Sequence, residues 1–307
     1  MATLSKHATL YLPSADSKAV GVVQIVHGMC EHQKRYKPLA DFLNENNYIV
    51  ITSDLRGHGD NVTRDQEYGY FGDNGTTNLI NDIHEITLYV KSEYPDLPYF
   101  LLGHSMGTLI STCYMKRYDN YLDGLILSGM PGSNNMVSFA KKLVRFLATI
   151  KGEFYRSDFV NGLMNGPFEK PFKDEGSKFA WLSKNKANVR AYETDSKCGF
   201  VFTLNGFYTL TDLMEETYKK ASFIMKNPAL PIILLSGEDD PCMGDKKNFM
   251  NSVNLFKDAG YKNVQYVLYP GMRHEIFNDN DKDKAREDVL AALDIITNMK
   301  TVKKKNL

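Results

Sequence analysis

A serine between two glycines is the first place in this chain where the residue types could do chemistry. Residues 103–107 read Gly-His-Ser-Met-Gly, with Ser105 at the centre. They follow the apolar run 99–102 and precede a segment, 108–115, that is typical of a helix. A G-x-S-x-G sequence between a buried strand and a helix is the pattern of a nucleophile elbow, a turn so tight that the positions around the serine must lack side chains. The pattern predicts that Ser105 is the nucleophile of an acyl transfer.

A serine hydroxyl attacks a carbonyl only when a base takes its proton, and histidine is the usual base near neutral pH. Hydrolases with this elbow carry their other two catalytic groups later in the chain, first an acid and then the histidine. Of the seven histidines, only His274 follows the elbow. It comes directly after the last expected strand, where a parallel sheet places its sites. We therefore expect His274 to be the base.

The acid that orients the imidazole should follow the strand at 232–236, in the run Gly-Glu-Asp-Asp-Pro at 237–241. Spacing alone does not separate three adjacent acids. We favour Asp240, because the ring of Pro241 would help to fix the backbone there. Asp239 is the main alternative.

An oxyanion hole needs two backbone N–H groups that point at the developing charge. One should belong to Met106, the residue after the nucleophile. The other should come from the loop His-Gly-Met-Cys-Glu-His at 27–32, which follows an early strand, and we choose Met29. The alternative is a plain turn at Gly28. No H-E-x-x-H motif or paired ligand spacing is present, so we expect neither a metal site nor a cofactor.

Short apolar runs alternate with helical patterns along most of the chain, which predicts a parallel sheet covered by helices on both faces. The expected strands are 20–26, 48–53, 99–102, 124–128, 231–236 and 264–269, with 8–12 as an antiparallel edge strand. Helices are expected at 36–45, 78–94 and 281–298.

The interval from Pro131 to Pro228 is too long for a structureless loop and should be an inserted subdomain. Its first part, 136–150, has an apolar face opposite a basic face, and aromatic residues follow. These apolar side chains could pack the insertion against the core. Alternatively, some could line an acyl pocket, or the basic amphipathic helix could contact lipid.

Composition excludes several classes of function. The formal net charge is zero, with 37 acidic and 37 basic residues, so nucleic acid is not expected as a partner. No apolar run approaches the roughly 18–20 residues that cross a bilayer, and residues 1–7 lack a signal-peptide pattern. We expect a cytoplasmic protein. The four cysteines are scattered and should be reduced and structural.

Taken together, these motifs resemble the α/β-hydrolase fold family and, within it, the monoacylglycerol lipase and lysophospholipase group, also filed with the serine aminopeptidases (S33). The resemblance covers nearly the whole chain and rests on the segments 27–32, 53–59, 102–107, 237–240 and 271–274. It implies a mostly parallel eight-stranded sheet with helices on both faces and an inserted helical cap. The core would comprise 1–130 and 229–307, and the cap 131–228. The position of the family's acid supports Asp240, and that of its oxyanion residue supports Met29.

The sequence therefore predicts a serine hydrolase that cleaves carboxylic esters through an acyl-enzyme. The resemblance implies lipid-like esters, monoacylglycerols or lysophospholipids, with transient contact between the cap and a membrane surface. One alternative is an aminopeptidase, which would need paired carboxylates in the cap to hold an ammonium group. No sequence feature indicates that any two acids of the insertion form such a pair. The candidate acids are Glu153, Asp158, Glu193 and Asp195. The other alternative is a catalytically inactive member of the fold that binds a ligand.

Overall fold

A seven-stranded sheet forms the centre of the computed structural model, which describes residues 7–305. The strand order is β1-β3-β2-β4-β5-β6-β7. β1 pairs antiparallel with β3, and every other neighbouring pair is parallel. The strands are β1 (Ala8–Tyr11), β2 (Gly21–Val26), β3 (Tyr48–Ser53), β4 (Tyr99–His104), β5 (Gly124–Ser128), β6 (Pro231–Gly237) and β7 (Asn263–Tyr269).

The expected count of eight strands is wrong for the described residues, which form seven. Each of the seven apolar runs does become a strand, and the eighth was implied by the family resemblance alone. The chain between β1 and β2 contains Pro13, which has no N–H to donate to a ladder. A turn follows at once, in which the N–H of Ser17 donates to the Ser14 carbonyl at 2.9 Å. This stretch therefore leads into β2 without forming another strand.

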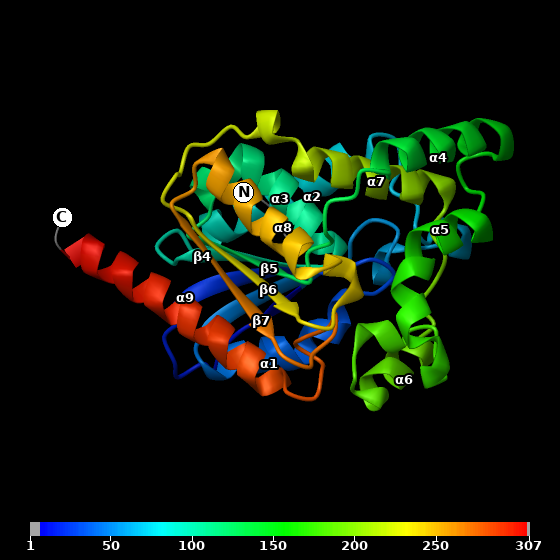
Figure 1. Cartoon of the computed structure of the whole chain (residues 1–307). Helices are drawn as coiled ribbons and strands as arrows, with labels where there is room; N and C mark the ends of the chain where they lie inside the picture. Colours follow the sequence, from blue (N-terminus) through cyan, green and yellow to red (C-terminus); the bar gives the residue numbers. More distant parts are fainter. Residues whose placement is uncertain (1–6, 306–307) are drawn as a thin grey trace.

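Helices cover both faces of the sheet (Figure 1). On one face lie α1 (Lys37–Glu45) and α9 (Lys282–Lys305), which share a buried apolar cluster with β2 and β4. On the other face lie α2 (Gly75–Glu93), α3 (Met106–Tyr118) and α8 (Lys246–Ala259), which form the larger cluster. Every residue of β2, β4 and β5 is buried, as expected for strands with helices on both sides.

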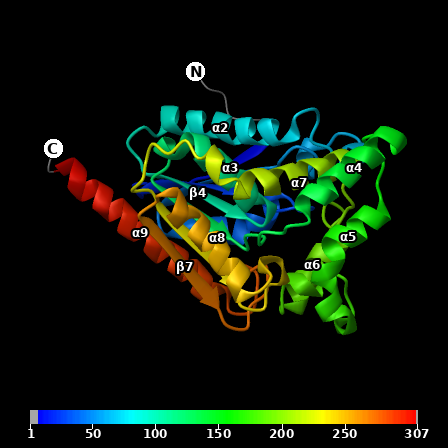
Figure 2. The ribbon, with the colours of Figure 1, turned by 45° about the horizontal axis from the view of Figure 1, so that its top comes forward.

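Four helices lie between β5 and β6, in the segment 131–228 that we call the insertion. They are α4 (Val137–Lys151), α5 (Asp158–Glu169), α6 (Lys186–Thr194) and α7 (Leu204–Tyr218). α7 packs against α3 and α4 and buries Phe207 and Leu213 in the larger cluster. Seen from two directions, α4, α5 and α6 lie beyond the ends of the sheet strands, on one side of the molecule (Figures 1 and 2). The division of the chain into a core, 1–130 and 229–307, and a cap, 131–228, stays a prediction.

The final helix, α9, is longer than the sequence pattern predicts. It runs to Lys305, whereas the pattern predicts its end at residue 298. Lys300 extends back from α9 to the Asp123 carboxylate, 2.7 Å away, which anchors this part of the helix to the core. Even with its 24 residues, α9 is not apolar enough to cross a bilayer, and neither is any other helix within residues 7–305.

The remaining helical segments within residues 7–305 are short 3₁₀ helices. They lie at Gln33–Tyr36, Gly59–Asn61, Asp65–Glu67, Asp119–Tyr121, Lys170–Glu175, Ala180–Leu182, Lys220–Ser222 and Pro241–Met243. The first and the last of these matter for the site, because they follow β2 and β6 and hold loop residues at the carboxyl end of the sheet.

Candidate active site

The backbone of Ser105 has the strained geometry that the motif predicts. Its φ of 53° and ψ of −122° lie outside the regions that non-glycine residues ordinarily adopt. The Ser105 N–H donates to the Ser128 carbonyl of β5 at 2.9 Å, which ties the turn to the sheet. A Cβ on Gly103 would come within 2.5 Å of the Gly107 carbonyl oxygen, and one on Gly107 within 2.1 Å of the Val26 carbonyl oxygen. Only glycine fits on either side of this serine.

His274 and Asp240, 34 residues apart in sequence, form a hydrogen-bonded pair. The Nδ1 atom of His274 lies 2.9 Å from Oδ2 of Asp240, and both side chains are buried. Asp240 is itself fixed, because Oδ1 accepts the Cys242 N–H at 2.8 Å and Oδ2 accepts the Ser236 hydroxyl at 3.2 Å. When Nδ1 of a neutral His274 carries the hydrogen and donates it to Asp240, Nε2 is unprotonated and can accept a proton or a hydrogen bond. No described residue hydrogen-bonds to that Nε2 atom.

The neighbouring acid, Asp239, lies elsewhere. Its carboxylate pairs with Lys184 at 2.7 Å, and 46% of its side chain is exposed. The structure thus brings together His274 and Asp240, and separates Asp239 from both.

The surroundings of His274 favour its charged form. Burial lowers its pKa, but the negative charge of Asp240 and the hydrogen bond to it outweigh burial, and the pKa is raised well above the usual value. An imidazole that accepts a proton from a serine needs this stabilisation, because it becomes positively charged in an apolar site.

Ser105 and His274 both line one cavity of about 410 Å³ between the sheet and the insertion. The ring centroids of Trp181 and His274 lie 5.0 Å apart, and those of Trp181 and Phe168 lie 5.4 Å apart. The wall is mainly apolar and includes Leu109, Val137, Ala140, Met164, Leu182, Leu210 and Met214. A long apolar group bound there would have its reactive end at the serine.

The loop 27–32, which we call the oxyanion loop, lies directly against the nucleophile. A Cβ on Gly28 would come within 3.0 Å of the Ser105 Cβ. The Gly28 N–H donates to Oε1 of Glu31 at 2.6 Å, and the Cys30 N–H donates to Nε2 of His58 at 3.2 Å. The N–H between them, that of Met29, has no hydrogen-bond partner in the described chain, and Met29 lines the cavity.

Met106 is the first residue of α3 and also lines the cavity. The first N–H groups of a helix have no acceptor within it. The structure thus places Met29 and Met106, both proposed from sequence as oxyanion donors, at the cavity that contains Ser105.

A buried ionic cluster beside the site was missed by sequence reasoning. Arg35 donates to Oε2 of Glu31 and to both carboxylate oxygens of Glu275, each at 2.7 Å. Asn188 of α6 donates to Glu275 at 2.7 Å. Burial raises the pKa of Glu31, but the charge of Arg35 outweighs it and holds the pKa at about 2. The cluster connects the oxyanion loop, the residue after His274 and the insertion.

The only sequence signal for this cluster was the acid and base four residues apart at Glu31 and Arg35. Pairs with that spacing are common on solvated helix faces. Glu275 lies 240 residues further along, so spacing could not have joined it to Arg35.

Three further histidines lie close to the site and are held neutral. Burial lowers the pKa of His58 to about 3 and that of His104 to about 4, and it also lowers the pKa of His27. His27 accepts the Leu55 N–H at Nε2. His58 accepts the Cys30 N–H at its own Nε2. These imidazoles thus act as hydrogen-bond acceptors for the loop backbones.

Two groups of side chains within residues 7–305 could in principle hold a metal ion. One is His32, Asp195 and Cys198, and the other is Asp240, Cys242 and His274; in each, the ligand atoms lie within 4.8 Å of one another. The second group contains the proposed base and its acid. His32 already bonds to Asp195 at 2.8 Å. That the protein needs no metal or cofactor stays a prediction.

Comparison with known proteins agrees with this geometry. The family model described as serine aminopeptidase, S33, matches residues 17–281. The chain belongs to this family of α/β-hydrolases. A monoglyceride lipase of Mus musculus is 30% identical over 276 residues, which cover 87% of this chain and 78% of the relative. The phospholipase YtpA of Bacillus subtilis is 26% identical over 277 residues, which cover 90% of this chain and 94% of the relative.

Among solved structures, a thermostable carboxyl esterase from Bacillus coagulans, in complex with glycerol, superposes with a TM-score of 0.86. It is 27% identical in sequence, and the match covers 97% of each chain. The prediction of an α/β-hydrolase fold is confirmed, and so is the prediction of a carboxylic ester hydrolase of the serine type. The individual roles of Ser105, Asp240, His274, Met29 and Met106 stay predictions and are argued next.

Proposed function

We propose that this hydrolase cleaves lipid-like carboxylic esters, such as monoacylglycerols or lysophospholipids, through an acyl-enzyme on Ser105. One observation carries the proposal. The strained serine and His274, which is paired with Asp240, line the same mainly apolar cavity.

In the first half-reaction, the Ser105 hydroxyl oxygen bonds to the ester carbonyl carbon while its proton passes to Nε2 of His274. The carbonyl oxygen takes the negative charge and accepts hydrogen bonds from the N–H groups of Met29 and Met106. Asp240 stays ionised and stabilises the imidazolium. The C–O bond to the alcohol then breaks, the proton passes from His274 to that alcohol, and the acyl group stays on Ser105.

In the second half-reaction, water takes the place of the serine. His274 accepts a proton from the water as its oxygen bonds to the acyl carbon, and the same two N–H groups stabilise the charge. The bond to Ser105 breaks and the serine regains a proton from His274. The products are a carboxylic acid and the free enzyme.

The apolar wall supports an acyl chain as the group beside Ser105. Burying a methylene group stabilises binding by about 0.8 kcal/mol, so a chain that fills such a cavity gains affinity with each carbon. The relatives named a monoglyceride lipase and a phospholipase support the same substrate class.

The peptidase alternative finds less support. The four acids proposed from sequence to hold a substrate ammonium do not line the cavity. Asp195 bonds to His32, Glu193 accepts the Ser177 hydroxyl, and Glu153 accepts the Tyr70 hydroxyl. Three carboxylates do line it, and Arg35 donates hydrogen bonds to two of them, Glu31 and Glu275; the third is Glu169.

The proposal extends to contact between the insertion and a lipid surface. Exposed large apolar side chains gather on α4, α5 and the loop between them, at Phe139, Phe146, Ile150, Phe154 and Phe159. Each is 45–67% exposed. Lys142 and Arg145 on α4 are exposed beside them and would favour an anionic surface. Replacing Phe146 and Ile150 with glutamate should lower activity on lipid dispersions and leave activity on a water-soluble ester unchanged.

A substrate profile of the purified protein tests the proposal. Rates would be compared for p-nitrophenyl esters from acetate to palmitate, for monoacylglycerols, for lysophospholipids and for aminoacyl anilides. We expect medium or long acyl esters to be preferred and anilides to be inert. A preference for acetyl esters or for anilides would contradict the assigned substrate class. The expected cytoplasmic location and the absence of a nucleic-acid partner likewise stay predictions.

A further inference from the structure

Cys30 has an unusual backbone conformation for its residue type. Its φ is +54°, in the left-handed region that costs a residue with a Cβ about 1 kcal/mol or more. In residues 7–305, three other non-glycine residues have a positive φ. Two are Asn47 and Asn74, of the type that tolerates this region best, and the third is Ser105. The two residues that adopt this conformation without an amide side chain, Cys30 and Ser105, thus both line the cavity.

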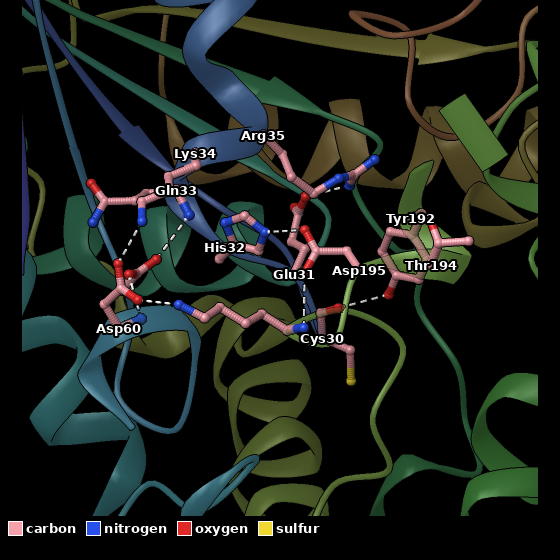
Figure 3. A network of polar contacts seen from close by, with 12 residues as sticks. Cys30, Glu31, His32, Gln33, Lys34, Arg35, Asp60, Tyr192, Thr194 and Asp195 are labelled. Atoms are coloured by element: carbon pink, nitrogen blue, oxygen red, sulfur yellow. Dashed lines mark hydrogen bonds and ion pairs between the residues drawn. The ribbon is translucent and has the colours of Figure 1, made fainter. Parts of the chain in front are cut away.

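Most of the contacts that hold Cys30 come from the insertion. Figure 3 shows the one from Tyr192. Its carbonyl oxygen accepts the Tyr192 hydroxyl at 2.8 Å and the Gly199 N–H at 2.9 Å. Its thiol donates to the Phe200 carbonyl at 2.9 Å. The core contributes the bond from the Cys30 N–H to His58 at 3.2 Å.

We propose that Tyr192 is a positioning residue for the oxyanion hole: its hydroxyl holds the Cys30 backbone so that the Met29 N–H points at the substrate carbonyl. The inference rests on the proposed role of Met29. On one side of Met29, Glu31 fixes the Gly28 N–H at 2.6 Å. On the other side, the insertion fixes Cys30. Met29 lies between two anchored residues and has its own N–H free of protein acceptors.

Small displacements of this loop matter because it lies against the nucleophile. Oxyanion donors act only within about 2.7–3.1 Å of the charged oxygen, and a misplacement of 1 Å can cost about 100-fold in rate. Loss of one contact to a strained residue lets the backbone relax toward an ordinary conformation. That relaxation would move the Met29 N–H.

The ring of Tyr192 is held independently of its hydroxyl group. Phe179 packs edge-on against it at 4.9 Å, and the Arg35 guanidinium lies 4.8 Å above its face. The side chain is 6% exposed, and burial raises the pKa of its hydroxyl well above the usual value, so it remains a donor at every working pH. Tyr192→Phe therefore removes one hydrogen bond and leaves the packing in place.

A second contact joins the same two segments. His32 at the end of the oxyanion loop bonds to Asp195 at 2.8 Å. Lys197 pairs with Asp60, which lies in the 3₁₀ turn Gly59–Asn61. The segment 192–200 thus contacts the oxyanion loop at both Cys30 and His32. Because these other contacts persist in Tyr192→Phe, we expect the variant to fold and to retain its cavity.

The test compares Tyr192→Phe with wild type on a soluble ester. We expect kcat to fall about 10-fold, the upper range for one neutral hydrogen bond, while KM changes less than threefold. The affinity for a trifluoromethyl ketone, which forms a tetrahedral oxyanion on the serine, should fall by the same factor as kcat/KM. The rate at which a fluorophosphonate labels Ser105 should fall in parallel, and this readout needs no ester substrate. Failure of the proposed substrate class would therefore not obscure this result.

Two comparisons separate positioning from a general loss of structure. Tyr155→Phe, at an exposed tyrosine of the insertion, should keep wild-type kcat and labelling rate. In a Cys30→Gly background, where positive φ costs little, Tyr192→Phe should lower kcat less than threefold. The proposal is overturned if Tyr192→Phe keeps wild-type kcat, if it raises only KM, or if it leaves the affinity for the ketone unchanged. It is also overturned if Tyr192→Phe lowers kcat by the same factor in the Cys30→Gly background as in the wild-type protein.

Discussion

Asp239 and Asp240 are adjacent in sequence but face different surroundings. The Asp240 carboxylate is buried 2.9 Å from Nδ1 of His274, whereas Asp239 pairs at the surface with Lys184. The divergence follows from the turn after β6, where the Asp240 side chain caps the 3₁₀ turn Pro241–Met243 by accepting the Cys242 N–H. The bond that caps this turn thus also fixes the orientation of the acid.

The two aspartates therefore give a matched pair of variants. Asp240→Asn keeps the shape of the side chain but removes the charge that stabilises the imidazolium, and we expect kcat to fall about 10⁴-fold. Asp239→Asn should change kcat less than threefold, because only a surface ion pair is lost. Steady-state hydrolysis of p-nitrophenyl butyrate measures both. A larger loss in Asp239→Asn than in Asp240→Asn would show that the wrong acid has been assigned.

The pH dependence of activity should report the His274–Asp240 pair. His274 acts as a base only when neutral, and its pKa is raised above 6.5. The acidic limb of kcat/KM should therefore lie above pH 6.5, with activity falling as the pH drops through it. Removing the charge in Asp240→Asn should move the limb of the residual activity to lower pH. An unchanged limb in that variant would mean that another group titrates.

Stability should fall in mild acid because of the neutral buried histidines. The pKa of His58 is about 3 and that of His104 about 4, against 6.5 for each in the unfolded chain. Between pH 6.5 and 4.5 the unfolded state binds protons that the folded state does not, so lower pH favours unfolding. His274 opposes this slope in part near pH 6.5, where its raised pKa keeps it protonated in the folded state and the unfolded chain is only half protonated. At lower pH it is protonated in both states and adds no slope.

Urea unfolding at pH 7, 6 and 5 measures this effect. We expect the free energy of unfolding to fall by about 1–3 kcal/mol per pH unit below 6.5. His58→Gln should remove about 1 kcal/mol per pH unit of that slope, because one proton-binding site is lost from the unfolded state. A free energy that stays constant between pH 7 and pH 5 would rule out neutral histidines in the folded protein.

A substitution at Gly107, the second glycine of the elbow, gives a further test of the geometry around Ser105. In Gly107→Ala the new methyl group would lie 2.1 Å from the Val26 carbonyl oxygen, so the elbow must shift away from β2. We expect a loss of about 2 kcal/mol or more in stability and a large loss of activity. The matched control is Gly162→Ala in α5, where nothing lies within 4 Å and alanine favours the helix. Calorimetry should show a lower Tm for Gly107→Ala and an equal or higher Tm for Gly162→Ala.

Much of the core was predictable because its signals are local. Each central strand is a continuous apolar run, and the spacing of Gly103 and Gly107 around Ser105 records a steric need that the structure displays directly. The strand count was wrong because it came from the family resemblance and not from an apolar run in this chain. The apolar runs of the sequence therefore predicted the number of strands better than the family resemblance did.

The contacts around the oxyanion loop were not predictable in the same way. Tyr192, Arg35 and Glu275 come from three distant segments and meet only when the insertion lies over the sheet. Nothing in the sequence near Tyr192 distinguishes its hydroxyl from that of any other helical tyrosine. Contacts of this kind depend on tertiary packing, which a pattern within one segment does not encode.

The central claim is that Ser105 carries the acyl group, and mass spectrometry of the intact protein tests it most directly. A brief reaction with a p-nitrophenyl ester, quenched in acid, should add one acyl mass to the wild-type protein, and peptide mapping should locate it on Ser105. Ser105→Ala should show neither the adduct nor measurable turnover. An adduct on another residue, or Ser105→Ala with wild-type esterase activity, would contradict the account.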